Sequence, residues 1–193
     1  MNVDNIIATI LAGGKSQRFG HDKSTVKLGD KTLLDHTIEK IENKFSEIIR
    51  SKHALAVNSC TAGLHLALDA LGIKSGDKVF VPSLTFAASA EVITYFDAIP
   101  IFLDIDYSTG LISPHILESA LEEHPDAKAL IIVHYAGQSA QMFSDSNSKG
   151  VIEICKEANI PIVEDAAHAA GTKFNGNKIG SHGTAVCFSF HPV

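Results

Sequence analysis

Short apolar runs of strand length alternate along the chain with segments whose apolar residues recur every three or four positions. The runs predict β-strands and the periodic segments predict amphipathic helices. We expect strands at 6–11, 78–81, 100–103, 129–133, 161–163 and 185–190, and helices at 32–45, 61–71, 86–96, 114–123 and 151–158. Such alternation is typical of an α/β fold with a mostly parallel sheet.

Local signals place several helix ends. Leu64, Leu68 and Leu71 fall on one helical face, and Gly72 ends that helix. Ser113 is the expected N-cap of a helix whose first residue is Pro114. Ligands in parallel α/β sheets bind beyond the carboxyl ends of the strands, so the residues after each strand are the candidates for chemistry.

Composition narrows the choice of function. The 193 residues suit one domain or two small ones, and 45% hydrophobic content allows a real core. The net charge of −6, without a basic block, gives no support for nucleic-acid or anionic-membrane binding. Three cysteines without a CxxC pair predict neither a disulfide framework nor a zinc site, and they suit a reducing cytoplasm. The apolar run at 6–12 is too short for a signal peptide or a membrane span, and we predict no metal site.

A glycine-rich loop follows the first predicted strand. Glycines allow the backbone to approach a phosphate, although a simple turn with solvated basic side chains is the alternative. The pattern L-A-G-G-x-S-x-R-x-G-x-D-K resembles the signature loop of nucleotidyltransferases of the molybdenum cofactor guanylyltransferase type. By that resemblance the nucleotide-binding residues are Leu11, Ala12, Gly13, Gly14, Arg18 and Lys23, the last two contacting phosphates. The resemblance ends near residue 50, so we expect a Rossmann-like β-loop-α fragment over 1–50 without activity of its own.

Four later segments carry candidate chemistry. Small and hydroxyl residues at 58–63 open a helix, which makes either an anion site or an ordinary N-cap. Phe86, just past a strand, is a core residue or a stacking surface for a planar ring. Asp165 ends an apolar strand, where it either pairs with a ring nitrogen or caps a helix. Ser189 supplies a second hydroxyl for a phosphate or simply faces a neighbouring strand.

Together these segments resemble the sugar-nucleotide aminotransferases of the DegT/StrS group, which depend on pyridoxal 5′-phosphate (PLP). The matches are N-S-C-T-A-G-L-H-L-A-L, V-P-S-L-T-F, V-x-Y-A-G-Q, V-E-D-A-A-H-A-x-G and C-F-S-F-H-P-V. The resemblance implies a partial PLP-transferase type I large domain, of the aspartate aminotransferase fold, over 51–193. It also implies cofactor-binding roles: Cys60 and Thr61 for the phosphate, Phe86 stacked on the ring, Asp165 at the pyridine nitrogen, His168 near the phenolic oxygen and Ser189 at the phosphate. His134 and Gln138 receive structural roles only.

The resemblance further implies a keto sugar nucleotide substrate and glutamate as amino donor. N-S-C-T-A and S-F-H-P-V are most similar to enzymes that aminate 4-keto-6-deoxy UDP-sugars on the way to pseudaminic acid. In the family, the lysine that binds PLP covalently follows S-F-H-P-V, and this sequence ends at Val193. We therefore expect two fused, incomplete fragments, joined near 50–53, with non-covalent PLP binding at best and no transamination.

Two other functions stay open from the sequence. One is nucleotidyl transfer, which depends on residues 11–23. The other is a non-catalytic piece that binds another subunit, or a second copy, through an unpaired sheet edge.

Overall fold

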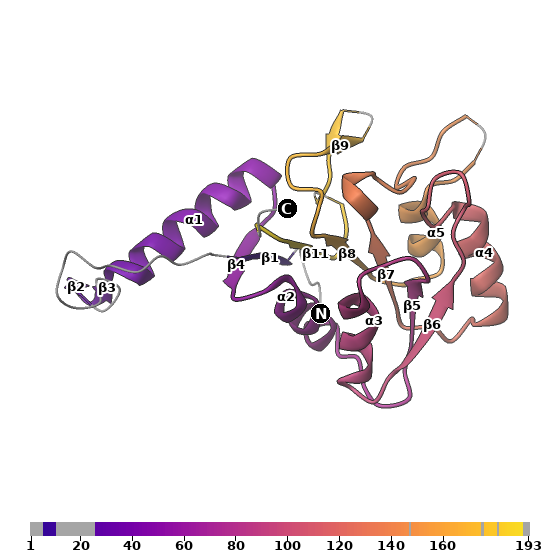
Figure 1. The fold of residues 1–193 in the computed structure, drawn as a ribbon, viewed down its shortest axis with the longest axis horizontal. Helices are drawn as coiled ribbons and strands as arrows, with labels where there is room; N and C mark the ends of the chain where they lie inside the picture. The colour runs from indigo at the N-terminus through magenta and orange to yellow at the C-terminus, as the bar shows by residue number, and fades with distance from the viewer. Residues whose placement is uncertain (1–5, 11–25, 147, 175, 181, 191–193) are drawn as a thin grey trace.

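The computed structural model describes residues 6–10 and 26–193, apart from 147, 175, 181 and 191–193. Its centre is a seven-stranded sheet in the order β4-β1-β11-β8-β7-β5-β6, and the described neighbours all pair in parallel (Figure 1). The predicted α/β fold with a mostly parallel sheet is therefore confirmed. The strands are β1 (Ile6–Ile10), β4 (His53–Val57), β5 (Lys78–Pro82), β6 (Ile99–Leu103), β7 (Ala129–Val133), β8 (Ile162–Ala166) and β11 (Ala185–Phe188).

Helices cover both faces of the sheet. They are α1 (Leu33–Ile49), α2 (Cys60–Ala70), α3 (Ala87–Thr94), α4 (Pro114–Glu123) and α5 (Val151–Glu157). Two core clusters divide along the pleat of β5, because successive strand side chains point to opposite faces. Val79 and Val81 belong to the cluster with α2 and α3, whereas Phe80 belongs to the cluster with α4 and α5.

Short elements complete the chain. Two hairpins lie outside the main sheet, β2 (Lys27–Leu28) with β3 (Lys31–Thr32), and β9 (Lys173–Phe174) with β10 (Asn177–Lys178). A 3₁₀ turn, η2 (Tyr135–Gly137), follows β7.

The predicted elements agree with the structure to within a few residues, with four differences that matter here. The helix expected at 32–45 continues to Ile49. The strand expected at 161–163 continues to Ala166 and so includes Glu164 and Asp165. The strand expected at 185–190 ends at Phe188, so Ser189 lies in the segment after it. The strand β4 was not predicted.

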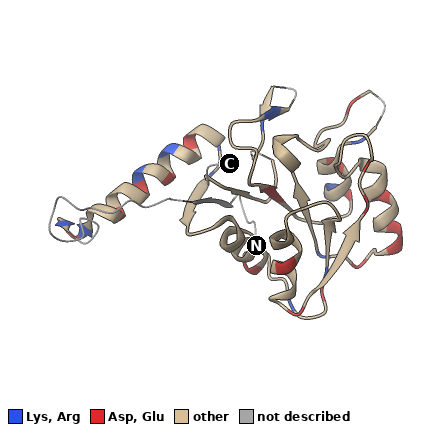
Figure 2. Ribbon diagram, in the orientation of Figure 1, with Lys and Arg blue, Asp and Glu red and all other residues tan. Residues whose placement is uncertain are grey.

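The helix α1 begins in a capping box and extends beyond the sheet (Figure 1). Asp35 N donates to Thr32 Oγ1 over 3.1 Å, and Thr32 N donates to Asp35 Oδ2 over 2.8 Å. At the other end, Phe45 packs edge-on against Phe188 with ring centroids 5.2 Å apart. The apolar end of α1 is thereby fixed to the sheet, while its acidic and basic side chains are distributed along the helix (Figure 2).

Two hydrogen bonds attach α1 to the rest of the fold. Glu42 Oε1 accepts the backbone N–H of Ala56 over 2.8 Å, which satisfies a donor on the edge strand β4. Lys178 Nζ donates to the carbonyl of Ile48 over 2.6 Å, and cations are favourable at a helix C-terminus.

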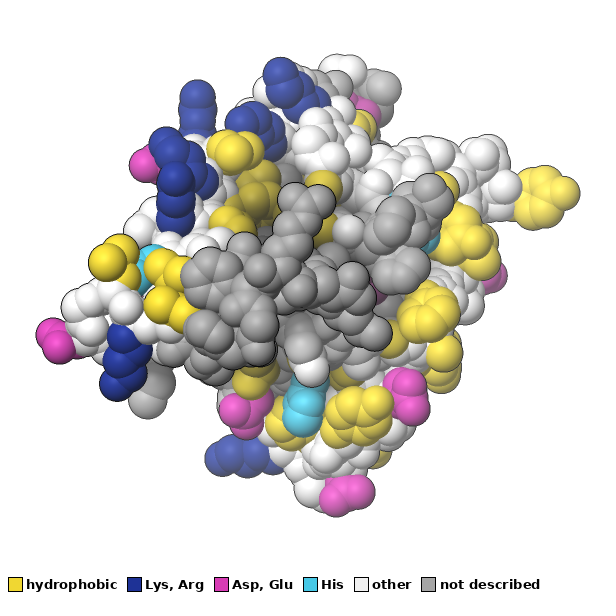
Figure 3. All heavy atoms as spheres, turned by 60° about the vertical axis from the view of Figure 1, so that its left-hand side comes forward, with side chains coloured by type: hydrophobic (Ala, Val, Ile, Leu, Met, Phe, Trp, Pro, Cys, Tyr) yellow, Lys and Arg dark blue, Asp and Glu magenta, His cyan; other side chains and the backbone are white. Residues whose placement is uncertain are grey.

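The surface is mixed. On the face in Figure 3, exposed hydrophobic side chains lie in several places among charged ones. No helix in the described part of the chain is both long and apolar enough to cross a membrane.

Candidate functional site

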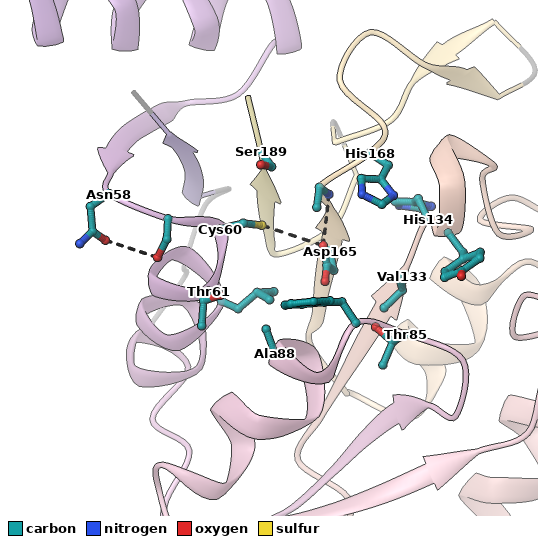
Figure 4. A pocket seen from close by; sticks show the side chains of 15 residues that line it. Asn58, Cys60, Thr61, Thr85, Ala88, Val133, His134, Asp165, His168 and Ser189 are labelled. Atoms are coloured by element: carbon teal, nitrogen blue, oxygen red, sulfur yellow. Dashed lines mark hydrogen bonds between the residues drawn. The ribbon is translucent and has the colours of Figure 1, made fainter. Parts of the chain in front are cut away.

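A cavity of about 410 Å³ opens at the carboxyl ends of the central strands. All six predicted cofactor-binding residues line it, although they come from four separate segments of the chain. In Figure 4, Asp165 lies in the middle of the labelled side chains, with Asn58, Cys60 and Thr61 on one side and His134 and His168 on the other. The lining is completed by Ser59, Leu64, Thr85, Phe86, Ala88, Val133, Tyr135, Ala167 and Ser189.

The start of α2 forms one wall. Ser59 is the N-cap: its side chain accepts from Ala62 N over 3.0 Å, and its carbonyl accepts from Gly63 N over 3.1 Å. These bonds use the third and fourth amides of the helix. The N–H groups of Cys60 and Thr61 are the first two, and they are not needed within the helix. The N-cap is therefore present in the structure, and the anion site at the same helix start stays a prediction.

Asp165 forms the floor of the cavity and is 6% exposed. Its Oδ2 accepts from Ser89 Oγ over 2.7 Å, and its Oδ1 accepts from Ala167 N over 3.1 Å. The Cys60 thiol is a longer contact, with Sγ 4.0 Å from Oδ1. Asp165 thus bonds to a backbone N–H in a turn and not at the start of a helix, and its carboxylate faces the cavity.

A second buried carboxylate lies one residue earlier on β8. Glu164 is 1% exposed; its Oε2 is 2.9 Å from His134 Nε2, and its Oε1 accepts from Gly183 N over 2.5 Å. His134 N also donates to the Asp165 carbonyl over 3.0 Å. The pair therefore connects the end of β7, β8 and the segment before β11, and its His134 also lines the cavity. The other ring nitrogen, His134 Nδ1, has no hydrogen-bond partner among the described residues.

The remaining predicted residues lie around the opening. Phe86 is 77% exposed, so its interpretation as a core residue is wrong. His168 is exposed and Ser189 is partly buried. Gln138 follows η2 and is not part of the cavity lining in the described structure.

The cysteine in the wall is not a nucleophile at neutral pH. Burial, and secondarily the negative charge of Asp165, raise the pKa of the Cys60 thiol well above its usual range. The thiolate is the reactive form of cysteine, so Cys60 acts as a small neutral side chain that faces a carboxylate.

Two functional candidates were missed in the sequence. Thr85 lines the cavity and Ser89 bonds to Asp165, and the two hydroxyls lie 2.7 Å apart. The sequence signal that could have found them is the four-residue spacing of Thr85 and Ser89 at the start of a predicted helix, which brings two side chains together. The predicted nucleotide-binding residues, in contrast, lie outside the described residues: Leu11, Ala12, Gly13, Gly14, Arg18 and Lys23.

Comparison with known proteins decides the family. The model of the DegT/DnrJ/EryC1/StrS aminotransferase family matches residues 22–193. The chain belongs to this family. Members of the DegT/DnrJ/EryC1/StrS family use PLP. The match begins within the segment assigned above to a nucleotidyltransferase-like fragment, and neither it nor the solved structures give evidence for such a fragment.

Solved structures agree with this fold. An aminotransferase from Psychrobacter cryohalolentis is 34% identical with a TM-score of 0.69, over 76% of this chain and 35% of that one. DesV from S. venezuelae is 34% identical with a TM-score of 0.70, over 80% and 39%. The putative sugar aminotransferase Spr1654 from Streptococcus pneumoniae, in its PLP form, is 32% identical with a TM-score of 0.68, over 80% and 41%. The chain thus spans well under half the length of these relatives.

Proposed function

We propose that the cavity binds PLP and that the chain is the cofactor-binding part of a sugar-nucleotide aminotransferase. The observation that carries the proposal is the convergence of six residues from four segments on one cavity, with a buried carboxylate at its floor. Convergent polar groups in an otherwise apolar cavity are the usual form of a cofactor site.

The residues present fit the cofactor chemically. The phosphate suits the N–H groups of the first turn of α2, and the Thr61 and Ser189 hydroxyls line the same cavity. The exposed ring of Phe86 is available for stacking on a planar heterocycle. Asp165, held by two hydrogen bonds, suits a protonated pyridine nitrogen.

When bound, PLP supplies an electron sink for moving an amino group. The chain's own residues would bind and orient it: Asp165 would keep the ring nitrogen protonated, and His168, which also lines the cavity, would contact a polar substituent of the ring. No lysine lines the cavity within the described residues. For these 193 residues we therefore propose non-covalent PLP binding without turnover.

We propose a keto sugar nucleotide as substrate and glutamate as amino donor for the complete enzyme. Support comes from the family match and from Spr1654, which is itself named a putative sugar aminotransferase. The motif similarity to enzymes of pseudaminic acid synthesis favours a 4-keto-6-deoxy UDP-sugar within this class. The three free cysteines favour a reducing, cytoplasmic setting.

The test is equilibrium dialysis of the purified chain against PLP at neutral pH. We expect saturable binding that dialyses away and that Asp165→Ala weakens by about 10- to 100-fold, the usual range for a hydrogen bond to a charged group. Asp126→Ala, an exposed aspartate on another part of the surface, is the matched control and should bind as the wild type does. Equal affinity of wild type and Asp165→Ala, or a borohydride-trapped adduct on the wild type, would contradict the proposal.

Nucleotidyl transfer is retained only as a prediction from residues 11–23. It predicts GTP or CTP binding that Lys23→Ala abolishes. Absence of binding at millimolar nucleotide would remove it.

A further inference from the structure

The Asp165 carboxylate accepts a hydrogen bond from the hydroxyl of Ser89, a residue that does not line the cavity in the described structure. Ser89, in the first turn of α3, is fully buried and donates to Asp165 Oδ2 over 2.7 Å. Ser89 is absent from the cavity lining in the described structure, so any effect it has on a ligand must pass through another residue.

The direction of the hydrogen bonds follows from their chemistry. A carboxylate only accepts, so the single hydroxyl proton of Ser89 is committed to Asp165. The 2.7 Å contact between Ser89 Oγ and Thr85 Oγ1 must then have Thr85 as the donor. The order Thr85 to Ser89 to Asp165 is therefore fixed, and each bond strengthens the next by polarising it.

This chain of hydrogen bonds joins two parts of the cavity wall. Thr85 lines the cavity immediately before Phe86, and Asp165 lies at its floor on β8. Both bonds are short, and Ser89 and Asp165 are buried while Thr85 is half-buried. The bonds therefore hold the carboxylate in one orientation and connect it to the segment that carries the exposed ring.

We propose that Ser89, supported by Thr85, is a positioning residue that aims the Asp165 carboxylate at the ring nitrogen of the bound cofactor. The inference rests on the proposed function, because it assumes PLP in this cavity. Ser89 acts only through Asp165, so its removal should weaken recognition of the ring nitrogen and leave recognition of the phosphate and the ring face intact.

Two ligands separate these effects. One is PLP, and the other is its carbocyclic analogue, in which a C–H group replaces the ring nitrogen. Affinities are measured by equilibrium dialysis for the wild type, Ser89→Ala, Thr85→Val and Ser83→Ala. Ser83 is an exposed serine in the same segment and serves as the matched control.

We expect Ser89→Ala to lower the affinity for PLP about tenfold, as for loss of one hydrogen bond to a charged group. Its affinity for the analogue should change by less than about twofold. Thr85→Val keeps the shape of the side chain but removes the hydroxyl that donates to Ser89 Oγ. It should reduce the preference for PLP over the analogue by less than Ser89→Ala does. Ser83→Ala should match the wild type with both ligands.

A merely structural role predicts a different outcome. If Ser89→Ala lowers both affinities equally, or changes neither, the inference is overturned while the proposed function stands. If the wild type binds neither ligand, the proposed function fails and the inference fails with it. Should Ser89→Ala not fold, as judged by circular dichroism, Thr85→Val decides: an unchanged preference for PLP over the analogue overturns the inference.

Discussion

The buried pair of Glu164 and His134 allows a sharp prediction about stability. The two side chains are 1% and 0% exposed, and Nε2 and Oε2 lie 2.9 Å apart. His134→Leu fills the space with an apolar side chain and leaves the Glu164 carboxylate with Gly183 N as its remaining hydrogen-bond donor in the described structure. Removing one partner of a buried hydrogen bond leaves the other group unsatisfied, which typically costs about 1–3 kcal/mol and more where that group is charged.

That loss is large against a typical stability of about 5–15 kcal/mol. In urea, where m is about 1–3 kcal/mol/M for small proteins, a loss of about 1–3 kcal/mol should lower the unfolding midpoint by roughly 0.3–3 M. The measurement is urea unfolding at pH 7, monitored by circular dichroism and by fluorescence. The two unfolding curves must coincide before a free energy of unfolding is calculated, because the calculation assumes two-state unfolding.

A second variant tests the cause. Glu164→Gln keeps an oxygen that can accept from Gly183 N but removes the charge. The double variant His134→Leu/Glu164→Gln should therefore be more stable than His134→Leu alone, by at least about 1 kcal/mol. The control is Lys44→Ala, which breaks an exposed pair of 2.9 Å with Glu47 and should cost no more than about 1 kcal/mol.

The reasoning would be refuted by a double variant that is no more stable than His134→Leu. In that case the loss would come from packing, and the charge of Glu164 would not be its source. A cost below about 1 kcal/mol for His134→Leu would equally show that the pair is not coupled.

Three further outcomes follow from single sites. Gly150→Ala should cost about 1–3 kcal/mol in urea unfolding or abolish folding, because its Cβ would meet the backbone of Phe143; wild-type stability would disprove the tight contact. Thr32→Ala removes the two bonds that the Thr32 hydroxyl makes with Asp35 N and Asp35 Oδ2, and it should cost about 1 kcal/mol, whereas no change would mean that α1 does not need its cap. Burial raises the pKa of the Cys155 thiol from 9.0 to about 12, so the folded state favours the protonated thiol. The contribution of this thiol to the free energy of unfolding is therefore constant below pH 9.0 and falls as the pH rises from 9.0 towards 12. Iodoacetamide at pH 9 should accordingly label Cys155 far faster in urea than in the folded chain; equal rates would refute the shift.

Much of the fold could be predicted because its signals are local. The helix α4 (Pro114–Glu123) begins at a serine N-cap followed by proline, and both signals lie in consecutive residues. The strand β7 is a continuous apolar run, as expected for a strand covered on both faces. The strand β4 escaped prediction because it is an edge strand with exposed and half-buried positions, which leaves little apolar contrast to detect.

The candidate cofactor residues were also predictable, for a related reason. Each belongs to a short motif at the end of a strand or the start of a helix, and the carboxyl ends of parallel strands meet at one edge of the sheet. Strand order then brings segments as distant as residues 60 and 165 into one cavity. The roles of these residues remain predictions.

The sequence by itself determined the α/β alternation, the motif residues and the likeness to one aminotransferase family. Only the tertiary structure decided which polar groups pair. Ser89 meets Asp165 across 76 positions, and His134 meets Glu164 across 30. Such contacts depend on strand order and on the side of the sheet to which each helix packs, and no local pattern encodes either. A carboxylate in an apolar segment of the sequence predicts a hydrogen-bond partner, because burying an unpaired carboxylate is costly. Only the packing of the folded chain determines which residue that partner is.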